Sequence, residues 1–133
     1  MSCLKAIVTN EAPKAIGPYS QGILAGDFLF VSGQIPLNPM TGTLVEGDIQ
    51  AQTHQVLQNI RAILNKAGLD MQHVVRTDVF LLDLRDFAAM NQVYEGYFPE
   101  VPRPARQTVQ VAGLPAGSRI EISCIAYCGL NKI

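Results

Sequence analysis

A small set of polar side chains is the part of this sequence that could do chemistry. They stand in short motifs: Tyr19 in GPYSQG, Ser32 and Gly33 after the apolar run FLFV, Asn91, Arg106, and Glu121 in RIEI. Arg106 stands out because Pro102 and Pro104 precede it and restrict the backbone that carries it. Hydroxyl, amide, guanidinium and carboxylate groups of this kind suit hydrogen bonding and proton transfer to a small polar molecule.

Several of these residues also have a structural explanation that the sequence leaves open. Tyr19 could fill the edge of the core, and Asn91 could be a solvated position on a helix. Glu121 could lie in solvent or form an ion pair with Arg76.

The sequence lacks the residue patterns that are typical of metal sites and of cofactor-binding motifs. The two histidines, His54 and His73, are too far apart for a local metal motif, and we expect both at the surface. Cys124 and Cys128 fall on one side of a predicted strand, where a cysteine acts as a small hydrophobic residue. No GxGxxG, Walker or GxSxG motif occurs. We therefore expect no metal site, and any enzyme here would work without a metal or an organic cofactor.

The composition describes one globular domain over residues 1–133, with 48% hydrophobic and 16% charged residues. The net charge is −1, and the ten lysines and arginines are scattered along the chain. Nucleic-acid binding needs clustered cations that displace counterions, so this composition argues against a nucleic-acid partner.

The expected compartment is the cytoplasm. No stretch approaches 18 uninterrupted apolar residues, which argues against a membrane span. The chain contains three cysteines, an odd number, and its N-terminus does not resemble a signal peptide. These features favour a reducing compartment.

Hydrophobic periodicity and turn residues divide the chain into elements. Apolar residues at offsets of three and four predict an amphipathic helix that begins after Asp48, its N-cap, and stops at Gly68. A second helix is predicted between about Arg85 and Phe98, where Pro99 would end it. Strands are predicted at residues 4–10, 23–25, 28–32, 74–82, 107–112 and 119–128.

The order of these elements predicts their packing. Two helices cannot cover both faces of a six-stranded sheet. We therefore expect an α+β sandwich of two layers, with both helices on one face.

The other sheet face contains too much apolar surface for contact with solvent alone. In the predicted strand 119–128, alternate residues share one side, which we expect to face the helices: Ile120, Ile122, Cys124, Ala126 and Cys128. In residues 74–82, both alternating sets contain apolar side chains: Val75, Thr77, Val79 and Leu81 on one side, and Val74, Arg76, Asp78, Phe80 and Leu82 on the other. We therefore predict a homo-oligomer that buries the second face.

Five segments that occur in order along the chain resemble those of one protein family. They are GPYSQG (17–22), FVSGQIP (30–36), YEGYFP (94–99), PRPAR (102–106) and RIEI (119–122). Together they resemble the Rid family, also called YjgF-type proteins, and most closely its RidA deaminase branch. The resemblance covers nearly the whole chain.

The resemblance implies a fold and an activity. The fold would be chorismate-mutase-like, with a six-stranded mixed sheet, in a homotrimer with a central barrel and active sites between subunits. The activity would be hydrolysis of reactive enamines and imines, such as 2-iminobutanoate and 2-iminopropanoate, to 2-oxo acids and ammonia. No cofactor would be required.

The resemblance also implies roles for the polar set. Arg106 would grip the substrate carboxylate with two parallel hydrogen bonds, which a lysine cannot reproduce. Glu121 would position and partly deprotonate the attacking water, and Tyr19 would line the pocket. Substrate binding would also involve Ser32, Gly33, Asn91 and Thr108.

Three residues depart from the family pattern. Thr108 stands where a cysteine is common, which removes any thiol-dependent property. Gln107 stands where a small or apolar residue is usual, and Ser123 replaces a common glutamate. Family contacts at the Thr108 position are largely through the backbone, so deamination need not suffer. Gln107 could alter the pocket wall or the subunit contact. We expect Ser123 to change the barrel lining rather than catalysis.

The sequence is compatible with two other functions. Some family members are associated with ribonuclease activity or inhibition of translation, although this chain has no basic stripe and no paired histidines. A non-catalytic module that binds carboxylate metabolites, or acts like a chaperone, would use the same arginine.

Overall fold

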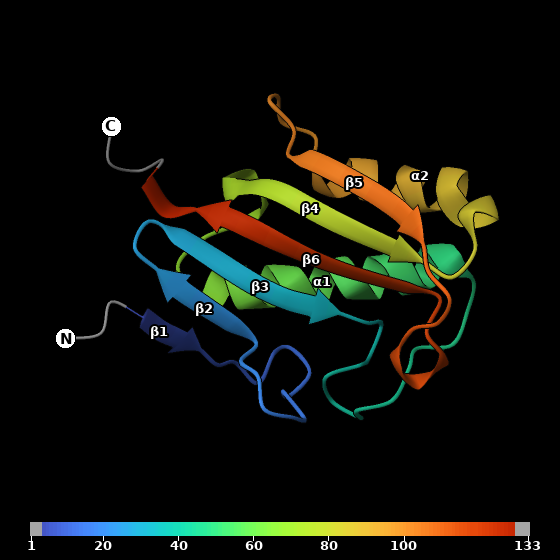
Figure 1. The fold of residues 1–133 in the computed structure, drawn as a ribbon, viewed down its shortest axis with the longest axis horizontal. Helices are drawn as coiled ribbons and strands as arrows, with labels where there is room; N and C mark the ends of the chain where they lie inside the picture. Colours follow the sequence, from blue (N-terminus) through green and yellow to red (C-terminus); the bar gives the residue numbers. More distant parts are fainter. Residues whose placement is uncertain (1–3, 130–133) are drawn as a thin grey trace.

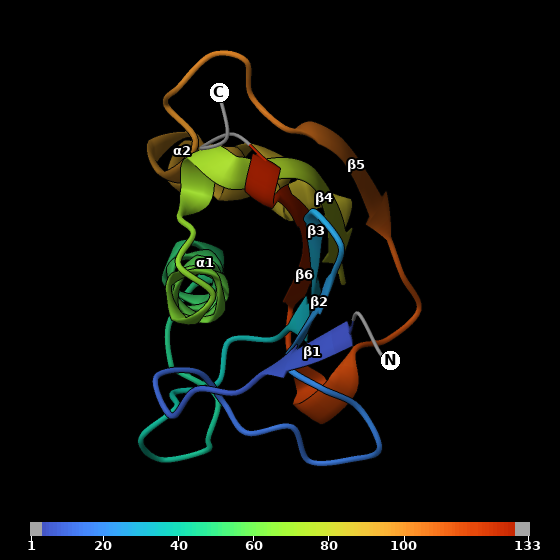
Figure 2. The same ribbon diagram turned by 90° about the vertical axis from the view of Figure 1, so that its left-hand side faces the viewer.

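The computed structural model describes residues 4–129. The helices and strands labelled in Figure 1 are β1 (Leu4–Ile7), β2 (Gly22–Ala25), β3 (Phe28–Gln34), α1 (Ile49–Lys66), β4 (Val74–Leu81), α2 (Phe87–Tyr97), β5 (Ala105–Gln110) and β6 (Ile120–Tyr127). The strands form one six-stranded sheet in the order β1-β2-β3-β6-β4-β5. Strands β4 and β5 are parallel, and every other neighbouring pair is antiparallel. Both helices lie on one face of the curved sheet (Figure 2). The predicted two-layer α+β sandwich is therefore confirmed.

Helix α1 begins and ends where its sequence predicts. Asp48 is the N-cap, and its carboxylate accepts a hydrogen bond from the Ala51 amide at 2.9 Å. Gly68 follows the C-cap in the left-handed region, at φ 81°, which glycine adopts without steric conflict. Within residues 4–129, no helix combines the length and apolar composition that a membrane crossing needs.

We expect Asp48→Ala to lower the free energy of unfolding by about 1 kcal/mol, because a helix N-terminal amide loses its acceptor. Asp48→Asn keeps an acceptor oxygen and should lose much less. Urea denaturation at one fixed protein concentration measures both changes. Equal losses in the two variants would show that the cap contributes nothing.

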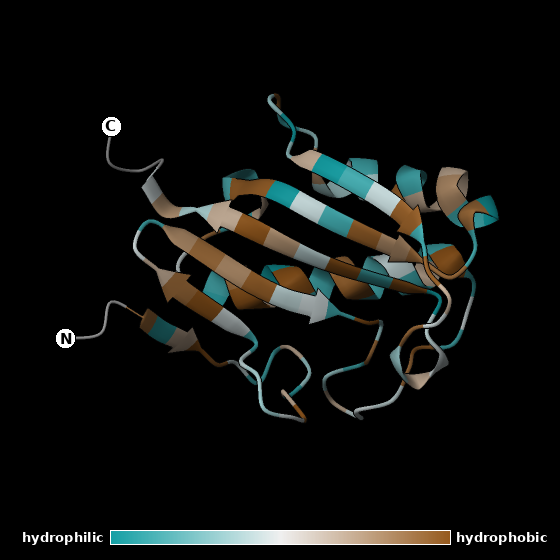
Figure 3. Cartoon of the chain, viewed as in Figure 1, coloured by the Kyte–Doolittle hydropathy of each residue, from teal (hydrophilic) through white to brown (hydrophobic). Residues whose placement is uncertain are grey.

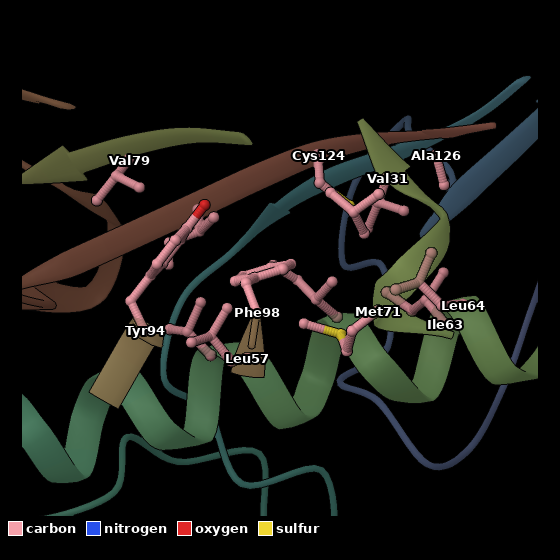
Figure 4. Packing of buried hydrophobic residues seen from close by; sticks show 14 of the residues in the cluster. Val31, Leu57, Ile63, Leu64, Met71, Val79, Tyr94, Phe98, Cys124 and Ala126 are labelled. Atoms are coloured by element: carbon pink, nitrogen blue, oxygen red, sulfur yellow. The ribbon is translucent and has the colours of Figure 1, made fainter. Parts of the chain in front are cut away.

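The core lies between the helices and the inner face of the sheet. Figure 4 shows side chains from α1, α2 and several strands meeting there. On β6, Ile120, Ile122, Cys124 and Ala126 are all buried, as alternation predicts. Burial raises the pKa of the Cys124 thiol to about 12, so this residue is an unreactive part of the core. Cys128 is partly buried against the same core, and Cys3 lies outside the described residues.

The predicted faces of β4 are wrong at its first two residues. Val74 pairs with Ala126 and Arg76 pairs with Ile125, so Val75 is an extra residue in the strand. This irregularity turns Val74 toward the core and leaves Val75 exposed. Beyond it, β4 follows the predicted alternation.

Of the two histidines, His54 is exposed as predicted, but the surface prediction for His73 is wrong. His73 is buried, with 5% of its surface exposed. Its Nδ1 accepts a hydrogen bond from the Asp70 amide at 3.1 Å, while Asp70 caps the short helical turn Met71–His73. The histidine is buried because it completes this capping box.

Several element boundaries also differ from the predictions. Strand β1 ends at Ile7 rather than residue 10. Strand β5 begins at Ala105, which places Arg106 inside the sheet rather than at its entrance. Residues Leu84–Asp86 form a separate 3₁₀ turn before α2.

The sheet face opposite the helices is partly apolar and open. Figure 3, which shares the view of Figure 1, shows hydrophobic residues along the strands, and the exposure of individual side chains shows which of them lie on this face. Phe28 and Phe30 of β3 and Val109 of β5 are each about two-fifths exposed, at 42%, 45% and 38%. Arg76 forms an ion pair with Asp78 on the same strand, at 2.9 Å, rather than with Glu121.

Candidate functional site

Arg106 lies on the helix side of the sheet, where it faces α2. It is the register partner of Thr77 in the parallel β4–β5 pairing. Its Nη1 donates a hydrogen bond to Oδ1 of Asn91 at 2.7 Å. Its guanidinium carbon lies 4.7 Å from the ring centroid of Tyr94 and 5.5 Å from that of Phe87. A neutral amide and two rings therefore hold Arg106, and these contacts do not neutralise its positive charge.

Two buried residues behind Arg106 are not among the predicted site residues. The hydroxyls of Tyr94 and Thr77 lie 2.7 Å apart and share a buried hydrogen bond. Burial raises the pKa of Tyr94, so its phenol stays protonated at neutral pH. Tyr94 opens the YEGYFP segment, which is the one sequence signal that could have identified it.

A second group of predicted residues surrounds a separate cavity. Tyr19, Gly33 and Glu121 all line this cavity, which has a volume of about 320 Å³. Its remaining wall is largely apolar and includes Pro13, Ile16, Ile35, Leu37 and Pro115. A small molecule with an aliphatic side chain suits such a wall.

Glu121 packs directly on the backbone of Gly33. A Cβ atom built on Gly33 would collide with the Glu121 carboxylate. Burial raises the pKa of Glu121, because its charged form loses contact with water. A carboxylate with a raised pKa accepts a proton more readily than an exposed one, as a general base must.

The loop that carries Tyr19 is tied to the sheet by two polar side chains. Ser32 donates its hydroxyl hydrogen to the Ser20 carbonyl, and its backbone amide bonds to the Gln21 carbonyl. Gln21 is buried, and its side-chain amide bonds to backbone groups of Thr9, Ala12 and Pro13. The structure therefore shows Ser32 holding the loop, and sequence reasoning did not identify Gln21.

Thr108 lies two residues beyond Arg106 on the same face of β5. Its hydroxyl is buried and has no hydrogen-bond partner within residues 4–129. It is the register partner of Val79, which belongs to the core. The side chain thus lies on the same side of the strand as the arginine.

The predicted site residues therefore form two clusters that one chain does not bring together. We call Arg106, Asn91 and Thr108 the arginine cluster, and Tyr19, Gly33 and Glu121 the glutamate cluster. Register places Glu121 beside Phe80 and Phe80 beside Val109, three residues beyond Arg106. Strand spacings then separate the two residues by roughly 14 Å, and their side chains leave opposite faces of the sheet. A small ligand that touches both clusters must lie between two chains.

A larger cavity lies elsewhere. It has a volume of about 830 Å³ and runs along α1 beside residues 8–11. None of the predicted site residues lines it, and its arginine, Arg61, already forms an ion pair with Asp70 at 2.9 Å. In the described part of the chain, histidine, cysteine, aspartate and glutamate side chains do not gather in groups of three that could hold a metal ion.

Comparison with known proteins gives consistent matches along the chain. A family model described as Endoribonuclease L-PSP matches residues 9–128. A RutC family protein of Pyrococcus horikoshii is 54% identical over 123 residues, which cover 92% of this chain and 97% of that protein. An Arabidopsis thaliana protein named Reactive Intermediate Deaminase A, chloroplastic, is 48% identical over 122 residues, covering 92% of this chain and 65% of the relative.

The fold also matches solved structures. The crystal structure of Escherichia coli TdcF with bound serine superposes with a TM-score of 0.88 at 45% identity. The match covers 92% of this chain and 98% of that one. The bound ligand of that protein is a small amino acid, which carries a carboxylate.

Proposed function

Since this chain belongs to the YjgF/Rid family, we propose that it is a cofactor-independent hydrolytic deaminase of reactive enamines and imines. Its substrates are 2-imino acids such as 2-iminobutanoate and 2-iminopropanoate, and its products are 2-oxo acids and ammonia. The observation that carries the proposal is Arg106, a guanidinium held by Asn91 and Tyr94 with its charge available to a carboxylate. The name of the Arabidopsis relative and the serine bound to TdcF support this substrate class.

The site is completed by a second chain in a homotrimer with a central barrel. The arginine cluster of one chain and the glutamate cluster of its neighbour face each other across the contact. The partly apolar open face of the sheet supports such an assembly, because an exposed apolar surface of this kind favours burial. The separation of the two clusters in one chain supports it independently.

In this arrangement, Arg106 binds the substrate carboxylate and orients the neighbouring C=N bond. Glu121 takes a proton from a water molecule as the water oxygen bonds to the imine carbon. The same carboxyl group then returns the proton to the nitrogen. Glu121 next takes the remaining proton from the new hydroxyl group and passes it to the amino nitrogen. The C–N bond then breaks, ammonia leaves, and the carbon keeps the oxygen as a 2-oxo group. Because Gly33 has no side chain, it leaves the space that the Glu121 carboxylate occupies.

The test is to generate 2-iminobutanoate in situ and to follow its decay with and without the protein. Faster decay with matching release of 2-oxobutanoate and ammonia supports the deaminase. Binding of 2-oxobutanoate without any acceleration would instead favour a non-catalytic module that binds carboxylate metabolites.

We expect Gly33→Ala to lower kcat by at least about tenfold, because the new methyl group displaces the Glu121 carboxylate. The thermal midpoint should change little, since the displaced atoms end a flexible side chain. Gly96→Ala is the matched control, because a Cβ atom at Gly96 meets open space. Steady-state kinetics and thermal denaturation measure both effects. A normal kcat in Gly33→Ala would remove this glycine from the site.

The description of the family model favours one alternative, a ribonuclease. Glu121 would then act on RNA instead of an imino acid. An RNA-cleavage assay on the wild type and Glu121→Ala decides this point. Cleavage by the wild type alone would favour the ribonuclease over the deaminase.

A further inference from the structure

Arg106 belongs to a closed ring of contacts that includes two residues outside the proposed ligand contacts. Arg106 and Thr77 are register partners on parallel strands, so their side chains leave the sheet on the same face. Tyr94 of α2 touches both: its ring lies 4.7 Å from the Arg106 guanidinium carbon, and its hydroxyl lies 2.7 Å from that of Thr77. The strand pairing closes the ring.

We propose that Tyr94 and Thr77 are positioning residues for Arg106, and that their shared hydrogen bond determines how tightly the substrate carboxylate is held. This inference rests on the proposed function, because it assigns a carboxylate ligand to Arg106. Neither residue is among the proposed substrate contacts.

The position of the Tyr94 ring is restricted from several sides. Tyr94 is 6% exposed and Thr77 is fully buried. The ring of Phe98 packs on Tyr94 with 4.6 Å between centroids, and Figure 4 shows both rings between α1 and the sheet. A buried phenol needs a hydrogen-bond partner, and Thr77 supplies it from the strand beside Arg106. The ring therefore presents one fixed surface to the guanidinium.

Asn91 and Tyr94 restrain Arg106 in complementary ways. They are three residues apart on α2, so both reach the same side of the helix. Asn91 accepts one hydrogen bond from Nη1, and the Tyr94 ring restrains the guanidinium carbon. A guanidinium has five N–H donors, so others remain for a carboxylate. A guanidinium that is already oriented loses less freedom when it binds.

The kinetic test separates positioning from general stability. We expect Tyr94→Leu to raise KM for 2-iminobutanoate about tenfold, through loss of the ring surface, with kcat nearly unchanged. Tyr94→Phe and Thr77→Val should each raise KM about threefold, and the double variant should raise it no further, because both break one bond. Ile63→Val, a core change in α1, is the stability control and should leave KM unchanged. Additive effects in the double variant, or an unchanged KM in the single variants, would overturn the proposal.

A measurement without substrate keeps this inference separate from the proposed function. The ring current of Tyr94 should shift the NMR signal of the Arg106 Nε–H group, which is identified by its absence in Arg106→Lys. In Tyr94→Leu, the signal should move to the region of the other arginines. If Tyr94→Leu does not fold, the Thr77→Val variant tests the positioning role instead. The Arg106 Nε–H signal should also move in that variant. An unchanged signal overturns the positioning role, whereas absence of imine hydrolysis by the wild type overturns only the proposed function.

Discussion

Arg106→Ala should lower kcat/KM for the hydrolysis of 2-iminobutanoate by about 10²–10⁴-fold, since two charge-assisted hydrogen bonds to the carboxylate are lost. Arg106→Lys keeps the charge but not the planar pair of donors, so its activity should fall between the wild type and Arg106→Ala. The fold should persist in both variants, because Arg106 is only partly buried near the edge of the sheet. Imine decay under steady-state conditions measures the effect.

The matched control is Arg61→Ala. Arg61 lies on α1, away from both clusters, where it pairs with Asp70. Its loss should leave the rate unchanged. A wild-type rate in Arg106→Ala would mean that no carboxylate is bound there, and the proposed mechanism would then be wrong.

Glu121→Gln should lower kcat by about 10²–10⁴-fold, the usual contribution of a general acid–base group. Glutamine keeps the shape and removes the proton acceptor. In the wild type, kcat should fall as pH falls through the pKa of Glu121, which burial raises above its ordinary value. The residual activity of Glu121→Gln should not show this fall in kcat at low pH. Glu11→Gln, at an exposed position, should keep both the wild-type rate and the fall in kcat at low pH.

The same substitution should not weaken the fold. Because burial raises the pKa of Glu121, any stability tied to its protonated form is present at low pH and lost as pH rises through that pKa. Glutamine stays neutral throughout. Denaturation at pH 4 and pH 7 measures the free energy of unfolding of both proteins. Relative to the wild type, Glu121→Gln should be more stable at pH 7 than at pH 4. A large loss of stability at pH 7 would instead assign Glu121 a structural role.

Periodicity and capping residues predicted the fold where the chain follows regular rules. Asp48 and Gly68 mark the ends of α1 in the sequence as they do in the structure. Strict alternation failed at Val75, because one extra residue in a strand leaves no mark on composition. The burial of His73 could not be predicted, because its capping box pairs Asp70 with a histidine. The usual capping box pairs a serine or threonine with a glutamate or glutamine.

The candidate site could be predicted as a set of residues but not as an arrangement. Motifs identified Arg106 and Glu121, yet their separation depends on the strand order, which only the folded chain reveals. The contact between Tyr94 and Thr77 joins residues 17 positions apart, on a helix and a strand. Its geometry follows from how α2 packs on β4, so neither residue could be paired from local pattern.

The buried side chain of Gln21 has a consequence for the energetics of binding. Its bonds to Thr9, Ala12 and Pro13 tie the segment that carries Tyr19 to the end of β1 before any ligand arrives. A segment that is already ordered has little conformational entropy left to lose on association. This half of the binding surface should therefore behave as a rigid template, and little of the favourable contact energy of a small metabolite is spent on ordering it.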